Sequence, residues 1–452
     1  MQTVSAAWAL LPVGWQRDVS VTIGADGRIQ AVTLGSAAGA AGVLLPAPCN
    51  LHSHAFQRAM AGLTERSGPD PKDTFWTWRR AMYRFLDLLT PDQVQVIAEL
   101  AFLEMLEAGF AAVGEFHYLH HGAGGALYDD PSEMSGRISA AAERVGLGLA
   151  HLPVLYMQGG ADGRGLAGGQ LRFGTSRDGF ERLVEGAERH VSNLPPDSSL
   201  GLAAHSLRAV GPDALTWAAG LRPEAPFHLH IAEQVAEIEE IRAVHGTTPL
   251  AWLLDTQEVD HRWCLVHATH ITAEETAGLA KSGAVAGLCP VTEANLGDGV
   301  FPGVPYLAEG GRFGIGTDSN IRIGLTEELR CLEYAQRLQH KARAVMTSDG
   351  RSTGRTLFAE VLAGGAQAIG RDAGGIATGL WADLVLLDDR DLDLQGLGGE
   401  VLLDSFIFAA GDTVVRDVWS AGRHVVRGGR HIARDAVESA YRQNIAELRT
   451  MI

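Results

Sequence analysis

The run 43-VLLPAPCNLHSH-54 joins an apolar, strand-like segment to two histidines that are two residues apart. Side chains along an extended strand repeat every two residues, so His52 and His54 face the same side. Paired imidazoles at the end of a strand are a common half of a metal site. A histidine pair alone is weak evidence, because two polar residues in a loop give the same pattern. Other parts of the chain must supply the remaining ligands.

Seven further strand-like runs follow the first one and alternate with segments of helical apolar spacing, such as 92–109 and 235–246. Strands that alternate with helices indicate a parallel sheet, and eight repeats predict a (β/α)8 barrel of the α/β class. One glycine-rich stretch, 158–175, interrupts the alternation and reads as a long loop. The seven runs are 110-FAAVGEFHY-118, 147-LGLAHLPVLY-156, 200-LGLAAHSL-207, 226-PFHLHIAE-233, 263-WCLVHAT-269, 284-AVAGLCPV-291 and 313-FGIGTDSN-320.

Short strand-like segments with turn residues bracket the barrel. An Asp-Gly turn lies in 25-ADGRI-29, and similar alternating, strand-like patterns occur in 379–389 and 413–430. The last stretch, 434–450, has the apolar spacing of a helix. We therefore expect a small β-sandwich domain built from residues 1–45 and 375–432, a barrel domain from 46–374 and a C-terminal helix within 433–452.

Composition limits the classes of partner and compartment. The net charge of −17 gives no excess of lysine and arginine to neutralise phosphates, which argues against nucleic acid. An anionic substrate would be repelled by the overall negative charge, so local arginines would be needed to attract it. No apolar run has the length of a membrane span, and the first residues lack the basic segment of a signal peptide. The four separated cysteines fit reduced thiols, so we expect a cytoplasmic protein without a membrane partner.

Polar residues collect at the carboxyl ends of the predicted strands, the rim where catalytic groups of such barrels gather. His230 and Glu233 end the fifth run, His267 the sixth and Asp318 the eighth. Taken singly, His230 could be a satisfied strand-end histidine and Asp318 a turn residue. Together with His52 and His54 they offer three nitrogen ligands and one oxygen ligand. This set suits one divalent metal, zinc ahead of iron or manganese. Glu233 is then placed to shuttle protons, and His267 to polarise the group under attack.

Several motifs in this sequence resemble those of the amidohydrolase superfamily and, more closely, those of the formimidoylglutamate deiminases. The resemblance covers nearly the whole chain. The histidine pair marks only the superfamily, whereas the longer motifs are more specific. The motifs are 52-HSHAFQRAMAGLTE-65, 75-FWTWR-79, 230-HIAE-233, 266-VHATH-270, 292-TEANLGDG-299 and 314-GIGTDSN-320.

The resemblance implies a distorted TIM-type barrel and a homodimer. It also implies a hydrolase of linear amidines that converts N-formimino-L-glutamate to N-formyl-L-glutamate and ammonia in histidine degradation. One divalent metal, zinc with iron(II) as the alternative, would be held by His52, His54, His230 and Asp318. Glu233, His267 and Asp318 would be the catalytic residues. The fourth run contains no lysine, which favours one metal over two.

The implied substrate is a small dianion, so arginines in the site are needed on physical grounds. Arg208 with His205 matches the family's carboxylate-binding position, and Gln57 and Tyr118 match further substrate contacts. One more arginine should come from FWTWRR, and we favour Arg79 over Arg80. Two rival functions stay open: a guanine or adenosine-like deaminase of the same superfamily, and a non-catalytic metal-binding barrel protein.

Overall fold

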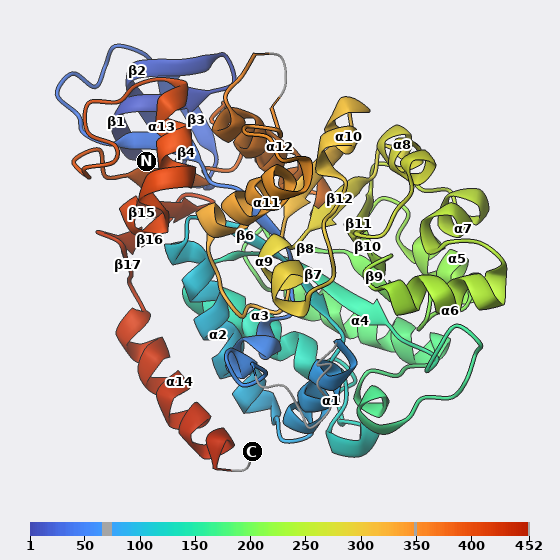
Figure 1. Cartoon of the computed structure of the whole chain (residues 1–452). Helices are drawn as coiled ribbons and strands as arrows, with labels where there is room; N and C mark the ends of the chain where they lie inside the picture. Colours follow the sequence, from blue (N-terminus) through green and yellow to red (C-terminus); the bar gives the residue numbers. More distant parts are fainter. Residues whose placement is uncertain (66–74, 348–349, 451–452) are drawn as a thin grey trace.

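Two β-sheets organise the computed structural model, which describes residues 1–65, 75–347 and 350–450 (Figure 1). Across these residues, eight parallel strands follow one another around a barrel in chain order. A parallel bridge between Ser53 and Asp318 joins the two end strands at the rim. The predicted α/β class and (β/α)8 barrel are confirmed. The strands are β5 (Cys49–Ser53), β6 (Ala112–His117), β7 (Gly148–Leu155), β9 (Leu202–Ser206), β10 (Phe227–Ile231), β11 (Trp263–His267), β12 (Val285–Leu288) and β13 (Arg312–Ile315), with the short β8 (Ser199–Leu200) beside β7.

Helices connect these strands and cover the outside of the barrel (Figure 1). Helix α2 illustrates why they begin where they do. Thr90 caps the helix, Gln93 completes a capping box, and Pro91 fits the first turn, where its missing N–H costs nothing. The helices in this region are α1 (Phe75–Leu86), α2 (Pro91–Glu107), α3 (Glu133–Val145), α4 (Arg177–Ser192), α5 (Pro212–Leu221), α6 (Val235–His245), α7 (Pro249–Thr256), α8 (Ala273–Ser282), α9 (Pro290–Leu296), α10 (Gly303–Ala308), α11 (Leu325–His340) and α12 (Thr353–Ala368), with the 3-10 turns η1 (Ala55–Met60), η2 (Ala123–Gly125) and η3 (Gly168–Arg172).

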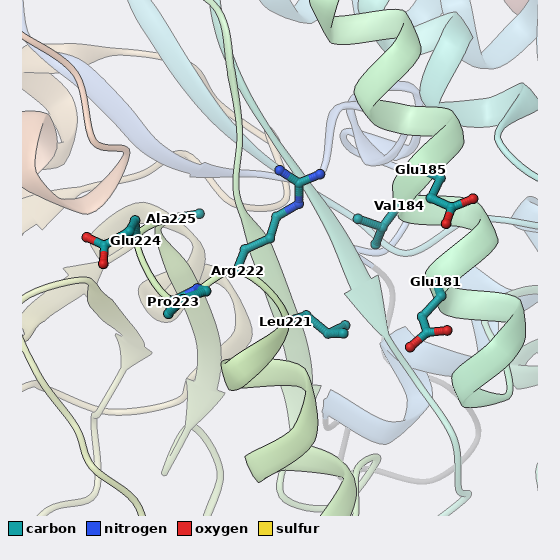
Figure 2. A pocket seen from close by; sticks show the side chains of 8 residues that line it. All are labelled: Glu181, Val184, Glu185, Leu221, Arg222, Pro223, Glu224 and Ala225. Atoms are coloured by element: carbon teal, nitrogen blue, oxygen red, sulfur yellow. The ribbon is translucent and has the colours of Figure 1, made fainter.

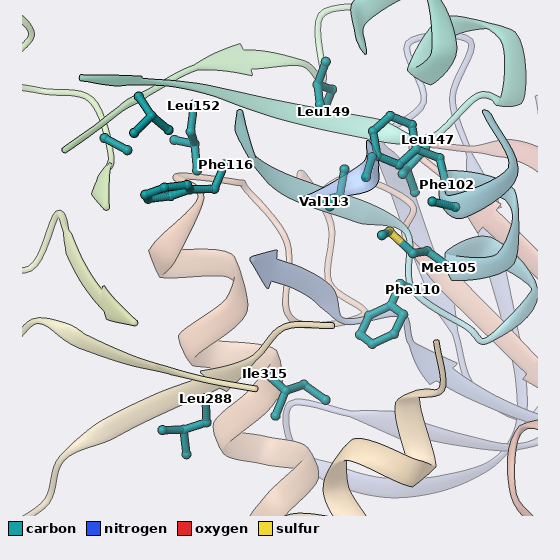
Figure 3. Close-up of a cluster of buried hydrophobic side chains, with 14 of the residues drawn as sticks. Phe102, Met105, Phe110, Val113, Phe116, Leu147, Leu149, Leu152, Leu288 and Ile315 are labelled. Carbon is teal, nitrogen blue, oxygen red and sulfur yellow. The ribbon is translucent and has the colours of Figure 1, made fainter. Parts of the chain in front are cut away.

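The main hydrophobic core lies between the barrel and its helices. Figure 3 shows the part in which Phe102 and Met105 of α2 approach Phe110 and Val113 at the start of β6. All four side chains are fully buried. Burying one such side chain contributes about 1.5–3 kcal/mol, so this layer stabilises the packing of α2 against the barrel.

The second sheet is assembled from both ends of the chain, as the sequence predicts. Its strand order within the described residues is β17-β16-β15-β14-β4-β1-β2-β3. The opening run therefore contains two strands, because β4 belongs to this sheet and β5 to the barrel. Pro46 ends β4 and Pro48 lies between the two strands, and proline interrupts a ladder of backbone hydrogen bonds. The strands are β1 (Gln2–Leu11), β2 (Gly14–Ile23), β3 (Ile29–Thr33), β4 (Val43–Pro46), β14 (Leu384–Leu387), β15 (Val415–Ser420), β16 (Arg423–Arg427) and β17 (Arg430–His431).

A buried ionic cluster fastens the two sheets to each other. Arg371 pairs with Asp383 at 2.7 Å and with Asp197 at 3.1 Å, and Arg423 reaches Asp197 at 2.7 Å. Asp197 precedes the barrel strand β8, whereas Asp383 and Arg423 belong to the terminal sheet region. Removing one partner of such a buried pair leaves an uncompensated charge, which makes this junction costly to break.

The chain ends in the predicted helix, α14 (Arg434–Arg449), which runs alongside α2 (Figure 1). Arg434 pairs with Glu107 of α2 at 2.7 Å. Between β14 and β15 lie α13 (Glu400–Ser405), η4 (Phe406–Ala410) and η5 (Asp412–Val414). Among the described residues, no helix combines the length and the apolar character that crossing a membrane requires.

Candidate active site

Four side chains from three strand ends converge at the barrel rim. His52 and His54 come from β5 and the residue after it, His230 from β10, and Asp318 from the segment after β13. His54 Nε2 lies 3.1 Å and His52 Nε2 3.5 Å from Asp318 Oδ1, and the Nε2 atoms of His52 and His230 are 3.0 Å apart. All four residues are buried, and their ligand atoms lie within 4.8 Å of one another. The structure thus brings together the whole predicted ligand set.

The hydrogen bonds around this cluster fit a divalent cation. His54 Nδ1 lies 2.8 Å from the carbonyl oxygen of Phe116, and His230 Nδ1 lies 3.0 Å from that of His205. A carbonyl only accepts, so each Nδ1 carries the proton and each Nε2 presents a lone pair to the centre. The Nε2 atoms of His54 and His230 are thereby available as metal ligands, and the Nε2 atom of His52 lies 3.0 Å from that of His230. Burial also lowers the pKa of His52 to about 3, which keeps its imidazole neutral.

The backbone at the rim is held in left-handed conformations that non-glycine residues rarely adopt. Asp318 has φ 41° and Asn320 has φ 54°. A hydrogen-bond network stabilises this turn: Asn50 Nδ2 donates to Thr317 Oγ1 at 2.7 Å, and Thr317 Oγ1 donates to Asn320 Oδ1 at 2.6 Å. The His54 N–H donates to the Asp318 carbonyl at 2.9 Å. Strain held by surrounding contacts is a feature of functional sites, and here it aims the Asp318 carboxylate at the histidines.

Glu233 and His267 lie beside the ligand cluster. His267 Nε2 is 3.8 Å from Glu233 Oε1, and the His267 ring stacks on the His230 ring with centroids 5.4 Å apart. On the other side of the ring, Nδ1 is 3.3 Å from Glu293 Oε1. Burial alone would lower the pKa of His267, but the negative charge of Glu233 and the hydrogen bond to Glu293 raise it to about 10. The imidazole is therefore arranged to hold a proton toward the cavity.

A cavity opens over this cluster. Its walls include every substrate-binding residue that the sequence suggests, except that the side chain of Arg80 lies outside the described residues. Gln57 Nε2 donates to Tyr118 OH at 2.8 Å. The cavity is lined by His54, Gln57, Trp78, Arg79, Met82, Tyr83, Tyr118, Phe173, His205, Arg208, His230, Glu233, His267, Leu296 and Asp318.

Sequence reasoning missed several residues of this site. Trp78, Met82 and Tyr83 share helix α1 with Arg79 and line the same cavity; Met82 and Tyr83 follow Arg79 by three and four residues, and Trp78 directly precedes it. The sequence FWTWRRAMY allows a helix to be predicted, but it does not indicate which side of that helix faces the cavity. Phe173 comes from the end of the glycine-rich stretch, and Glu293 from the TEANLGDG motif. Nothing in their local pattern indicates contact with the site.

A larger hollow lies elsewhere on the molecule, apart from the ligand cluster (Figure 2). It lies between α4 and the loop from α5 to β10. That loop enters β10 at its amino end, the face of the barrel opposite the metal ligands. Its lining includes Glu181, Glu185, Arg222 and Glu224, and none of these residues belongs to a cluster of potential metal ligands.

Comparison with known proteins agrees with this geometry. Residues 43–425 match the model of the amidohydrolase family, and residues 1–43 match that of "Formimidoylglutamate deiminase HutF, N-terminal domain". A Pseudomonas aeruginosa protein named formimidoylglutamate deiminase is 49% identical over 99% of this chain and 100% of its own length.

Two further proteins are similar to this chain to different degrees. A crystal structure of an amidohydrolase from Brucella melitensis is 48% identical, covers 99% of this chain and 100% of its own, and superposes with a TM-score of 0.95. An 8-oxoguanine deaminase from Pseudomonas aeruginosa is only 27% identical, over 85% of this chain and 83% of its own length. The chain belongs to the amidohydrolase family and, within it, to the formimidoylglutamate deiminases.

Proposed function

We propose that this chain is a metal-dependent deiminase that hydrolyses N-formimino-L-glutamate to N-formyl-L-glutamate and ammonia, a step of histidine degradation. One observation carries the proposal: a single cavity is lined by three members of the ligand cluster, His54, His230 and Asp318, and by two arginines, Arg79 and Arg208. The substrate has an amidine carbon to be hydrolysed and two carboxylates to be bound. In a chain of net charge −17, buried guanidinium groups are the means of binding a dianion.

Each polar residue of the cavity has a part in this reaction. A divalent cation held by the four ligands would lower the pKa of water to about 7 and so supply the nucleophile. Glu233 accepts the proton of the attacking water, and Asp318 orients that water. His267 holds a proton at Nε2 and donates a hydrogen bond to the group on the amidine carbon. Glu233 then returns the proton to the departing nitrogen, the C–N bond breaks, and ammonia leaves.

Gln57, Tyr118, His205, Arg79 and Arg208 bind the rest of the substrate in this proposal. Arg208 and Arg79 pair with the two carboxylates, while Gln57 and Tyr118 lie beside His54. We further expect one zinc ion per chain, with iron(II) as the alternative, and a cytoplasmic homodimer. The four cysteines are unpaired, which is in keeping with a reducing compartment.

The test is an ammonia-release screen with purified protein whose metal content is measured in the same preparation. The substrates are N-formimino-L-glutamate, guanine and adenosine. We expect rapid ammonia release from the first alone, with about one metal ion per chain. Release from guanine or adenosine without release from formiminoglutamate would assign the chain to the purine deaminases. No release from any substrate by metal-loaded protein would favour a non-catalytic role.

A further inference from the structure

The hydroxyl of Tyr156 links three separate parts of the chain next to the cavity. Tyr156 directly follows β7 and is buried. Its oxygen accepts a hydrogen bond from Arg79 Nη2 of α1 at 3.0 Å and another from Gln170 Nε2 of η3 at 3.1 Å. Arg79 lines the cavity, whereas Tyr156 does not. The direct hydrogen bond from the Tyr156 hydroxyl to the cavity wall therefore goes to Arg79.

The Tyr156 ring also touches a second wall of the cavity. It meets the His205 ring at a centroid distance of 4.7 Å and an angle of 67°, and the Phe173 ring at 5.6 Å. His205 and Phe173 both line the cavity. One side chain thus supports an arginine on one wall and a histidine on another.

Gln170, which does not line the cavity, holds the Tyr156 hydroxyl in place. Its Oε1 accepts the Ala167 N–H at 3.1 Å, and its Nε2 also reaches the Gly159 carbonyl at 3.3 Å. The same turn packs closely on α1: a Cβ built on Gly169 would lie 2.5 Å from the Tyr83 ring. Arg172 donates to the carbonyls of Leu86 and Leu89 at the end of α1. The glycine-rich stretch is therefore a support for α1 and its arginine.

The chemistry of this support suits a carboxylate-binding arginine. A carboxylate partner would orient the guanidinium but cancel its charge, whereas a phenol oxygen accepts a hydrogen bond and leaves the charge available. Arg79 also lies over the Tyr83 ring, with its guanidinium carbon 5.2 Å from the centroid, which adds a cation–π contact. Both contacts limit the freedom of a long side chain before the substrate arrives.

We propose that Tyr156, held by Gln170, is the positioning residue that aims Arg79 at one carboxylate of the substrate and so selects dianionic amidines over monoanionic ones. The inference rests on the proposed function. Three substrates distinguish a failure of this inference from a failure of the proposed function. They are N-formimino-L-glutamate, 4-(formimidoylamino)butanoate, which lacks the α-carboxylate, and 2-(formimidoylamino)butanoate, which lacks the side-chain carboxylate. Inactivity of the wild type on all three would overturn the proposed function, whatever Tyr156 does.

The decisive experiment is a double-mutant cycle with Tyr156→Phe and Arg79→Met. Loss of one hydrogen bond to a charged group predicts a rise in KM of roughly tenfold for Tyr156→Phe with kcat little changed. We expect no further rise when Tyr156→Phe is added to Arg79→Met, because the hydroxyl acts through that arginine. With one of the two monoanionic substrates the Tyr156→Phe effect should disappear. Additive effects in the cycle, or an equal loss with all three substrates, would overturn the proposal.

Two controls separate positioning from general stability. Tyr306 is also fully buried, and its hydroxyl donates to the Arg312 carbonyl at 3.0 Å away from the cavity. Tyr306→Phe should leave KM unchanged at a similar Tm. Gln170→Leu should raise KM in the same direction by a smaller factor, and it replaces Tyr156→Phe in the cycle if that variant does not fold. An unchanged KM in Gln170→Leu together with an unchanged KM in Tyr156→Phe contradicts the inference.

Discussion

Glu293 Oε1 lies 3.3 Å from His267 Nδ1 and accepts the backbone N–H of Cys289 at 2.9 Å. One carboxylate oxygen therefore holds both the His267 ring and the start of helix α9, which follows β12. Carboxylates behind a functional histidine orient its ring and favour its protonated form. This relationship makes Glu293 the support for the proton that His267 directs toward the cavity.

Glu293→Gln tests that support. The amide keeps the acceptor oxygen but removes the charge, so the pKa of His267 should fall relative to the wild type. The protonated imidazole would then be lost at a lower pH, and the alkaline side of the kcat profile should move toward neutral pH. We expect kcat to fall about 10- to 100-fold. An unchanged pH profile in a variant with normal Tm would show that Glu293 has no such role.

Glu233→Gln tests the proton shuttle. The side chain keeps its size but cannot carry a proton, so kcat on N-formimino-L-glutamate should fall about 10²- to 10⁴-fold. Metal content should remain that of the wild type, because Glu233 is outside the four-residue ligand set. Glu239→Gln is the matched control, since Glu239 is an exposed carboxylate on the neighbouring helix α6. Full activity in Glu233→Gln would remove Glu233 from the mechanism.

Arg208→Met tests the proposal that the substrate is a dianion. Arg208 is 7% exposed and lines the cavity beside His205. Removing a charged partner of a carboxylate should raise KM about 10- to 100-fold, with a smaller effect on kcat. Arg222→Met, in the hollow of Figure 2, removes an arginine far from the rim and should leave both constants unchanged. An unaltered KM in Arg208→Met would favour a purine substrate, which needs no such clamp.

Asp412 should make the stability of the protein depend on pH. Burial raises the pKa of Asp412 from 3.8 to about 6, although the Thr326 N–H donates to it at 2.9 Å. Between these two values the folded state binds more protons than the unfolded state, so the free energy of unfolding falls as pH rises from about 4 to about 6. Asp412→Asn should remove this loss of stability. Between pH 4 and pH 7, the free energy of unfolding of the variant should therefore rise relative to that of the wild type by on the order of 2–3 kcal/mol. Urea denaturation at the two pH values measures the difference. Equal pH dependence in both proteins would contradict the assignment.

The candidate metal cluster was predictable from the sequence because barrel geometry makes strand ends meet. His52 and His54 follow from strand periodicity, and His230 and Asp318 from their places after later strands. The supports behind the site were not predictable in this way. Glu293 and Tyr156 reach their partners through the packing of helices and loops, which local patterns do not encode. The same limit applies to the opening run, where two prolines divide one apolar segment between two sheets.

The most direct test of the central claim is to identify the products formed from N-formimino-L-glutamate. The tetrahedral carbon carries two nitrogens, and either could leave. Proton delivery from Glu233 to the terminal nitrogen predicts N-formyl-L-glutamate and ammonia in equal amounts, with turnover proportional to bound metal. Nuclear magnetic resonance with an enzymatic ammonia assay distinguishes the outcomes. Formation of formamide and L-glutamate, or turnover that survives complete removal of the metal, would contradict the account.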